Sequence, residues 1–115
     1  MNEAMAIETV RIEANGVEFV ALSCGEGPLV LCLHGFPDTA YGFKTLLGQL
    51  AGAGFRAVAP FLRGYAPTGP AADGDYRFDR LAADALALIE ALGAEQADLV
   101  GHDWGASVAW WVAAH

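Results

Sequence analysis

The sequence predicts an α/β fold: a β-hairpin followed by β-α-β-α-β-α, with a mostly parallel sheet. Three observations support this prediction. Asn15-Gly16 separates two runs of alternating character, residues 7–12 and 17–22, which is the strongest short-range signal for a hairpin. Residues 29–33 are apolar throughout, as expected of a strand covered on both faces. Beyond them, helical and strand-like segments alternate along the chain.

The first helix is predicted between residues 40 and 51, with Asp38 or Thr39 as its N-cap. Its apolar residues at helical spacing are Phe43, Leu46, Leu47 and Leu50. Residues 52–54, Gly-Ala-Gly, should end it, and residues 55–60 should form the next strand. A loop rich in Gly, Pro and Asp is expected over residues 63–76.

The second helix is the clearest element of the sequence. One face of it carries Phe78, Leu81, Ala82, Ala85, Leu88, Ile89 and Leu92. Gly93 should end this helix, residues 97–100 should form a further strand, and another helix is expected from Trp104 onward. The charged residues Lys44, Arg56, Glu90 and Glu95 are expected on solvated faces.

Composition narrows the class of protein. The 115 residues suit one domain, and 55% hydrophobic with 17% charged residues is typical of a chain that buries a core. Six basic against 14 acidic residues leave no basic patch for nucleic acid. The start of the chain does not resemble a signal peptide, and the apolar stretch 106–114 is too short to span a membrane. Cys24 and Cys32 lack the spacing of metal ligands, so we expect no metal or cofactor. Two cysteines outside a C-x-x-C pair fit a reducing compartment best, so we expect a cytoplasmic protein.

Gly101-His102-Asp103-Trp104-Gly105 stands between the last predicted strand and the last predicted helix. A nucleophile elbow needs small residues two positions before and two after the central residue, because the turn is sharp and strained. The turn would lift Asp103 above the sheet at a helix N-terminus, where the helix dipole favours an anion. The same edge of the sheet should carry His34-Gly35-Phe36-Pro37, which follows residues 29–33.

An aspartate at the centre of the elbow determines the class of reaction. Attack by a carboxylate on an ester would give a high-energy anhydride, whereas attack on a saturated carbon with a leaving group gives a stable ester. Epoxides and alkyl halides are such substrates. Water would then cleave the ester at the Asp103 carbonyl, with the backbone N–H groups of Trp104 and Phe36 as oxyanion donors. Phe36, Pro37 and Trp104 are expected to contact an apolar substrate.

The three segments together resemble the α/β-hydrolase fold superfamily, in its epoxide hydrolase and haloalkane or haloacetate dehalogenase branch. His34-Gly35-Phe36-Pro37 is similar to the H-G-x-P oxyanion segment, and Arg63-Gly64-Tyr65 to the R-G-Y turn after the next strand. Residues 101–105 match the epoxide hydrolase elbow. Phe36 differs from the Asn or Glu usual in haloalkane dehalogenases, and Trp104 from the Arg common in haloacetate dehalogenases. Where the family pattern R-G-Y-G-x-S has G-x-S, this sequence has Ala66, Pro67 and Thr68.

The resemblance implies a base, an orienting acid and cap-domain tyrosines that all follow the elbow. His115 lies twelve residues beyond Asp103, roughly 18 Å along a helix, and neither His102 nor His34 is placed to act as the base. We therefore expect residues 1–115 to be a partial core domain, without the cap and the catalytic histidine, and inactive alone. Residues 97–100 should form an exposed edge that self-associates or pairs with a complementing C-terminal part.

Two other interpretations remain open at this point. His34, Asp38, His102 and Asp103 could bind a metal, although comparable His-Asp pairs in phosphohydrolases lie on helices rather than after a strand and a glycine. Alternatively, the chain is a non-catalytic hydrolase fragment that serves as a binding or dimerisation module, using the exposed edge and the apolar residues 109–112.

Overall fold

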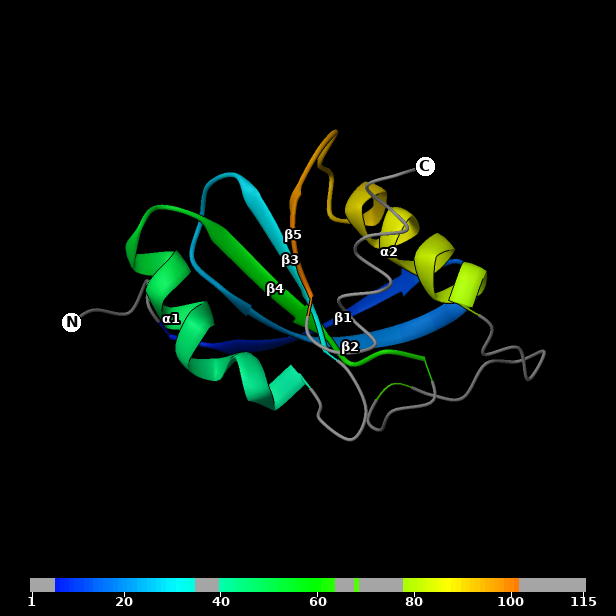
Figure 1. The fold of residues 1–115 in the computed structure, drawn as a ribbon, viewed down its shortest axis with the longest axis horizontal. Helices are drawn as coiled ribbons and strands as arrows, with labels where there is room; N and C mark the ends of the chain where they lie inside the picture. The colour runs from blue at the N-terminus through cyan, green and yellow to red at the C-terminus, as the bar shows by residue number, and fades with distance from the viewer. Residues whose placement is uncertain (1–5, 35–39, 64–67, 69–77, 102–115) are drawn as a thin grey trace.

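The computed structural model describes residues 6–34, 40–63, 68 and 78–101. Within them, five strands form one sheet in the order β1-β2-β4-β3-β5 (Figure 1). The strands are β1 (Glu8–Ala14), β2 (Val17–Cys24), β3 (Leu29–Leu33), β4 (Arg56–Pro60) and β5 (Asp98–Gly101). The helices are the 3-10 helix η2 (Ala40–Phe43), α1 (Lys44–Gly52) and α2 (Phe78–Ala91). The predicted helix from Trp104 onward lies outside the described residues.

The predicted hairpin is confirmed. β1 and β2 pair antiparallel, and Ala14 lies opposite Val17, so the turn contains only Asn15 and Gly16. Both turn residues have positive φ, 50° and 75°, as a type I′ turn requires. Asn tolerates this left-handed conformation better than other side chains, and Gly adopts it without steric cost.

The order of strands creates a mixed sheet with a parallel half. β3 pairs parallel with both β4 and β5, whereas β2 pairs antiparallel with β4. β3 has the bounds predicted from its apolar run, and it lies between its two parallel neighbours. The fold class predicted from the sequence is thus confirmed, and the antiparallel pairings come from the N-terminal hairpin.

The sheet separates two hydrophobic layers. Alternate residues of each strand point to opposite faces, so Leu31 and Val58 pack on the α2 side while Cys32 and Ala57 pack on the α1 side. The α2 side includes Phe19, Ala82, Ala85 and Leu88, all buried. In Figure 1, α1 and α2 lie on opposite sides of the sheet. The two clusters therefore form a three-layer α/β/α arrangement.

Both helices end in the same way before the strand that follows. The N–H of Gly54 donates to the Ala51 carbonyl (3.1 Å) and that of Phe55 to the Leu50 carbonyl (3.0 Å), with φ 95° at Gly54. Gly93, with φ 78°, closes α2 by the same Schellman pattern. These ends agree with those predicted, whereas α1 is preceded by a 3-10 turn, which is frequent at helix N-termini. Asp38 and Thr39, the predicted N-caps, lie outside the described residues.

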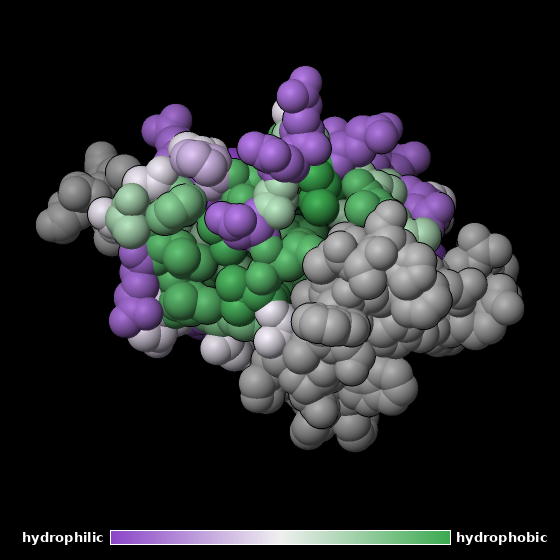
Figure 2. All heavy atoms as spheres, turned by 45° about the horizontal axis from the view of Figure 1, so that its top comes forward, coloured by the Kyte–Doolittle hydropathy of each residue, from purple (hydrophilic) through white to green (hydrophobic). Residues whose placement is uncertain are grey.

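One expectation about charged residues is wrong. Arg56 is half-buried, and its Nη1 donates a hydrogen bond to the Leu92 carbonyl (3.1 Å) just after α2. A cation at this position satisfies a carbonyl that the helix leaves unpaired and complements the negative end of the helix dipole. Figure 2 shows hydrophobic side chains gathered in the middle of the face in view, with hydrophilic side chains around and among them. Among the helices described, none is both long and apolar enough to cross a membrane.

Candidate active site

The carboxyl ends of β3 and β5 meet at one edge of the sheet. The two strands are parallel, and Leu33, the last residue of β3, is paired with Gly101, the last residue of β5. The chain therefore leaves both strands at neighbouring points. His34 begins the H-G-x-P-like segment at one of these points, and Gly101 begins the predicted elbow at the other. Gly35, Phe36, Pro37, His102, Asp103, Trp104 and Gly105 lie outside the described residues.

His34 is fully buried, and its ring is held by the backbone that follows β4. The N–H of Leu62 donates to Nε2 of His34 over 3.0 Å. An acceptor nitrogen must keep its lone pair free of a proton, so the neutral ring carries its proton on Nδ1. The expectation that His34 is not the general base stays a prediction. Because Nε2 accepts this hydrogen bond, it is not available to bind a metal ion.

A second contact supports the other end of the same segment. Ala40, which follows residues 35–39, is buried, and the ring of Tyr41 meets Phe61 edge to face with ring centroids 5.1 Å apart. Phe61 and Leu62 are consecutive residues directly after β4. Residues on both sides of the segment 35–39 are thus held by the same two residues.

Arg63, the next residue, forms a buried ion pair with Asp84 of α2. Its Nε lies 2.6 Å from Oδ2 of Asp84, and its Nη2 lies 2.8 Å from Oδ1. The two side chains are only 3% and 2% exposed, so the pair is shielded from water and salt. Nδ2 of Asn15, in the hairpin turn, also donates to Oδ1 of Asp84 (2.8 Å). One carboxylate thereby joins the hairpin, α2 and the turn after β4.

Thr68 is the other buried polar residue at this edge. Its Oγ1 accepts from the N–H of Val20 (2.9 Å) and donates to the Val20 carbonyl (3.4 Å). The same carbonyl accepts from the N–H of Phe61 (2.9 Å). β4 ends at Pro60, so this hydroxyl replaces the strand partner that Val20 lacks there. Thr68 stands where the family pattern R-G-Y-G-x-S has Ser, and the hydroxyl is kept.

The sequence indicated part of this network. Arg63 was singled out only as the start of a turn, and Asp84 was not singled out at all. A signal for Asp84 exists: it lies three residues after Leu81 and four before Leu88, so it borders the apolar face of α2. A carboxylate at such a position is buried only when it has a partner, and the partner could not be identified from spacing.

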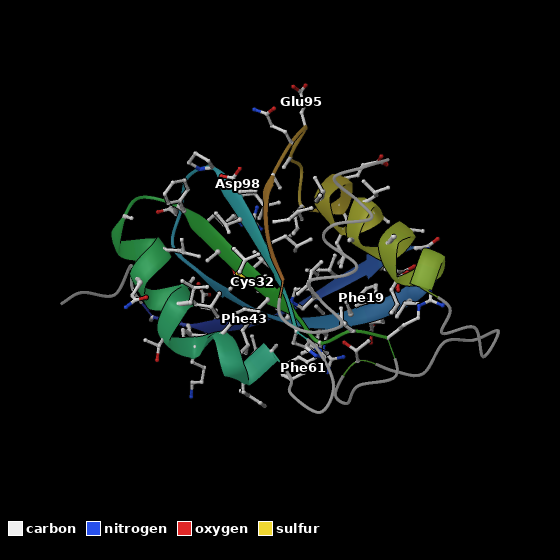
Figure 3. The ribbon with its side chains drawn as sticks, in the orientation of Figure 1. Phe19, Cys32, Phe43, Phe61, Glu95 and Asp98 are labelled. Carbon is white, nitrogen blue, oxygen red and sulfur yellow. The ribbon has the colours of Figure 1, made fainter. Side chains whose placement is uncertain are left out.

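Among the described residues, neither the pKa shifts nor the cavities indicate a second site. Burial raises the pKa of Cys32 to about 11, and it also raises that of Cys24, where Glu8 adds to the effect. Among the described residues, no group of three or more His, Cys, Asp or Glu side chains is arranged for a metal. A pocket of about 570 Å³ lies beside Arg56, Leu92 and Asp98. It is at the amino ends of β3, β4 and β5, and Figure 3 shows Asp98 in the upper and Phe61 in the lower part of the view.

Comparison with known proteins identifies the family. The model of the family described as "alpha/beta hydrolase fold" matches residues 28–115. The chain belongs to the α/β-hydrolase fold family. Members of this family that resemble it include "Epoxide hydrolase 3" of Siraitia grosvenorii, 43% identical over 91% of the chain. "Epoxide hydrolase A" of Mycobacterium tuberculosis is 42% identical over 86% of it.

Solved structures agree with this assignment. An epoxide hydrolase from Vigna radiata superposes with a TM-score of 0.89 and 42% identity, over 97% of this α/β-hydrolase chain. Epoxide hydrolase A from Mycobacterium thermoresistibile gives 0.88 and 40% over 94%. The chain spans only about a third of these relatives, 34% of the Siraitia protein and 35% of the Vigna structure.

Proposed function

We propose that this chain carries the nucleophile of an epoxide hydrolase, with Asp103 as the attacking carboxylate. The observation that carries the proposal is the pairing of Leu33 with Gly101, which brings the start of the H-G-F-P segment beside the start of the predicted elbow. The similarity of 42–43% to proteins named epoxide hydrolases supports the choice of substrate. The glycines at 101 and 105 support a turn sharp enough to present a side chain above the sheet.

The first chemical step is alkylation of Asp103. A carboxylate oxygen attacks one epoxide carbon, a new C–O ester bond forms, and the C–O bond of the epoxide breaks. The electron pair of the broken bond stays on the epoxide oxygen, which takes a proton from an acid or from water. No halide or other leaving group is lost, so the protein gains the whole mass of the substrate.

The second step is hydrolysis of that ester. Water adds to the Asp103 carbonyl carbon, and the resulting oxyanion needs two N–H donors, which we assign to the backbones of Phe36 and Trp104. The step also needs a base, and Nε2 of His34 already accepts the Leu62 N–H. We therefore expect the base from the part of the relatives that this chain does not span, and we expect the chain alone to stop at the ester.

The test is intact-protein mass spectrometry after incubation of the folded chain with styrene oxide. We expect one adduct of the full substrate mass, which peptide mapping assigns to Asp103 and which Asp103→Asn abolishes. Asp98→Asn is the matched control, because Asp98 is an exposed carboxylate at the other end of β5. An alkyl halide that modifies Asp103 faster than the epoxide would favour a dehalogenase instead.

Two features separate the ester from unspecific alkylation. Cys32, whose pKa is raised to about 11, holds little thiolate at neutral pH and should stay unmodified. In addition, hydroxylamine cleaves an aspartyl ester but leaves a cysteine thioether intact. A folded chain without an adduct at Asp103 would refute the proposal and favour a binding or dimerisation module.

A further inference from the structure

Residues 61–63, which follow β4, contact His34 and Tyr41, on either side of the segment 35–39, and a buried carboxylate of α2. We call these three residues the platform. Phe61 meets the ring of Tyr41, the N–H of Leu62 holds Nε2 of His34, and Arg63 pairs with Asp84. The platform thus connects His34, the residue before the segment proposed to supply an oxyanion donor, with an anchor on α2.

We infer that the Arg63–Asp84 ion pair is a positioning device: it fixes the platform, and through the Leu62 N–H it fixes the ring of His34, the residue from which the proposed oxyanion segment leaves the sheet. The inference rests on the proposed function for its catalytic part, since Phe36, two residues after His34 in the sequence, is the oxyanion donor proposed above. Arg63 and Asp84 are positioning residues and do not touch the reacting atoms.

The geometry of the pair suits this role better than a role in stability alone. Replacement of a buried ion pair by apolar residues is often neutral or stabilising, so burial of two charges is weak evidence of a stabilising function. The guanidinium and the carboxylate are joined by two hydrogen bonds, which fix orientation as well as distance. Arg63 is adjacent to Leu62, so a rotation of the Arg63 backbone would shift the N–H that holds His34.

Asn15 extends the device to the N-terminal hairpin. Its amide donates to the same Oδ1 that accepts from Arg63, so the carboxylate is held from two sides. The hairpin turn has a fixed type I′ conformation, with φ 50° at Asn15. The anchor of the platform is therefore a hairpin turn and a helix rather than another loop. A shift of a donor by about 1 Å can cost on the order of a hundredfold in rate, so the position of such an anchor matters for an oxyanion donor.

The test compares Asp84→Asn and Arg63→Lys with Glu18→Gln in the 115-residue chain. Asp84→Asn keeps the shape of the side chain and removes its charge, and Arg63→Lys keeps the charge and removes the two-point geometry. Glu18→Gln is the matched control, because it breaks the Arg11–Glu18 pair (3.0 Å) on the exposed surface of the hairpin.

The first readout is independent of catalysis. Hydrogen exchange of the Leu62 amide should accelerate about tenfold or more relative to the amides of the central strand β4 in both variants, and the ring nitrogen shifts of His34 should change. A uniform increase across all amides would indicate mere loss of stability and overturn the inference. Wild-type values at Leu62 and His34 in a folded Asp84→Asn protein would overturn it too. If Asp84→Asn does not fold, the same measurements on Arg63→Lys decide between these outcomes.

The second readout follows the ester. With Asp103 alkylated by styrene oxide, cleavage by hydroxylamine passes through the same oxyanion, so it should be about tenfold slower in the variants while the alkylation rate stays within about twofold. Equal slowing of both steps would contradict a role in the second step. Failure of wild type to form the adduct would refute the proposed function, and the Leu62 and His34 readout would still decide the structural part.

Discussion

Replacement of Thr68 by Val should destabilise the protein by leaving one buried N–H without a partner. The two side chains have nearly the same shape, so the change removes a hydroxyl and creates no large cavity. The Val20 carbonyl keeps the N–H of Phe61 (2.9 Å), whereas the Val20 N–H loses its acceptor at 2.9 Å. An unsatisfied buried donor costs about 1–3 kcal/mol. With a urea slope of about 1–3 kcal/mol/M, the unfolding midpoint should fall by roughly 1 M.

Thr68→Ser is the matched control, because it keeps the hydroxyl and removes one methyl group, a loss of about 1 kcal/mol. Urea unfolding gives the stability of each variant, and hydrogen exchange gives the local effect. The Val20 amide should lose its protection in Thr68→Val and keep it in Thr68→Ser. Protection of the Val20 amide in a folded Thr68→Val protein would show that another group accepts this N–H and would refute the reasoning.

Three other changes follow from the structure. Gly25→Ala should lower the melting temperature much more than Gly16→Ala: both glycines have positive φ, but a Cβ at Gly25 would collide with the Phe55 carbonyl oxygen, whereas one at Gly16 meets open space. Burial raises the pKa of Cys32 from 9.0 to about 11, so as the pH rises the thiol ionises in the unfolded state before it ionises in the folded state. The free energy of unfolding should be unaffected below pH 9 and should fall between pH 9 and 11, and this fall should be smaller in Cys32→Ala. Glu18→Gln should change the free energy of unfolding by less than about 1 kcal/mol in urea titration, since the Arg11–Glu18 pair is exposed.

Elements whose signals are local were predicted well. The hairpin was predicted from Asn15-Gly16, because only a type I′ turn combines two positive φ values with a two-residue loop. The ends of both helices were predicted from glycines that adopt positive φ, Gly54 and Gly93. Each of these predictions depends on the conformational range of one or two residues and needs no knowledge of the tertiary structure.

Contacts between distant segments were predicted less well. Asp84 and Arg63 are 21 positions apart, and Asn15 and Asp84 are 69 apart, and neither spacing has a periodic signature. Arg56 was expected in solvent because the sequence does not show that α2 ends beside the start of β4. For the candidate site, sequence order and the rule for parallel strands predicted a shared edge, and the pairing of Leu33 with Gly101 agrees. The roles of Asp103, Phe36 and Trp104 stay predictions.

The buried polar side chains of the described residues gather around the carboxyl edge of the sheet rather than being scattered through the core. They are His34, Arg63, Thr68 and Asp84. Burial of such groups is costly unless each is hydrogen-bonded, and within the described part every buried side-chain nitrogen or oxygen has a partner. An apolar core would hold the layers together at lower cost. Polar groups with fixed partners instead give directional contacts, which determine the orientation of the backbone and not only its proximity. Such contacts are useful where two chain segments must hold N–H groups in a set orientation toward one atom. The proposed oxyanion segment and the predicted elbow both leave the sheet at this carboxyl edge.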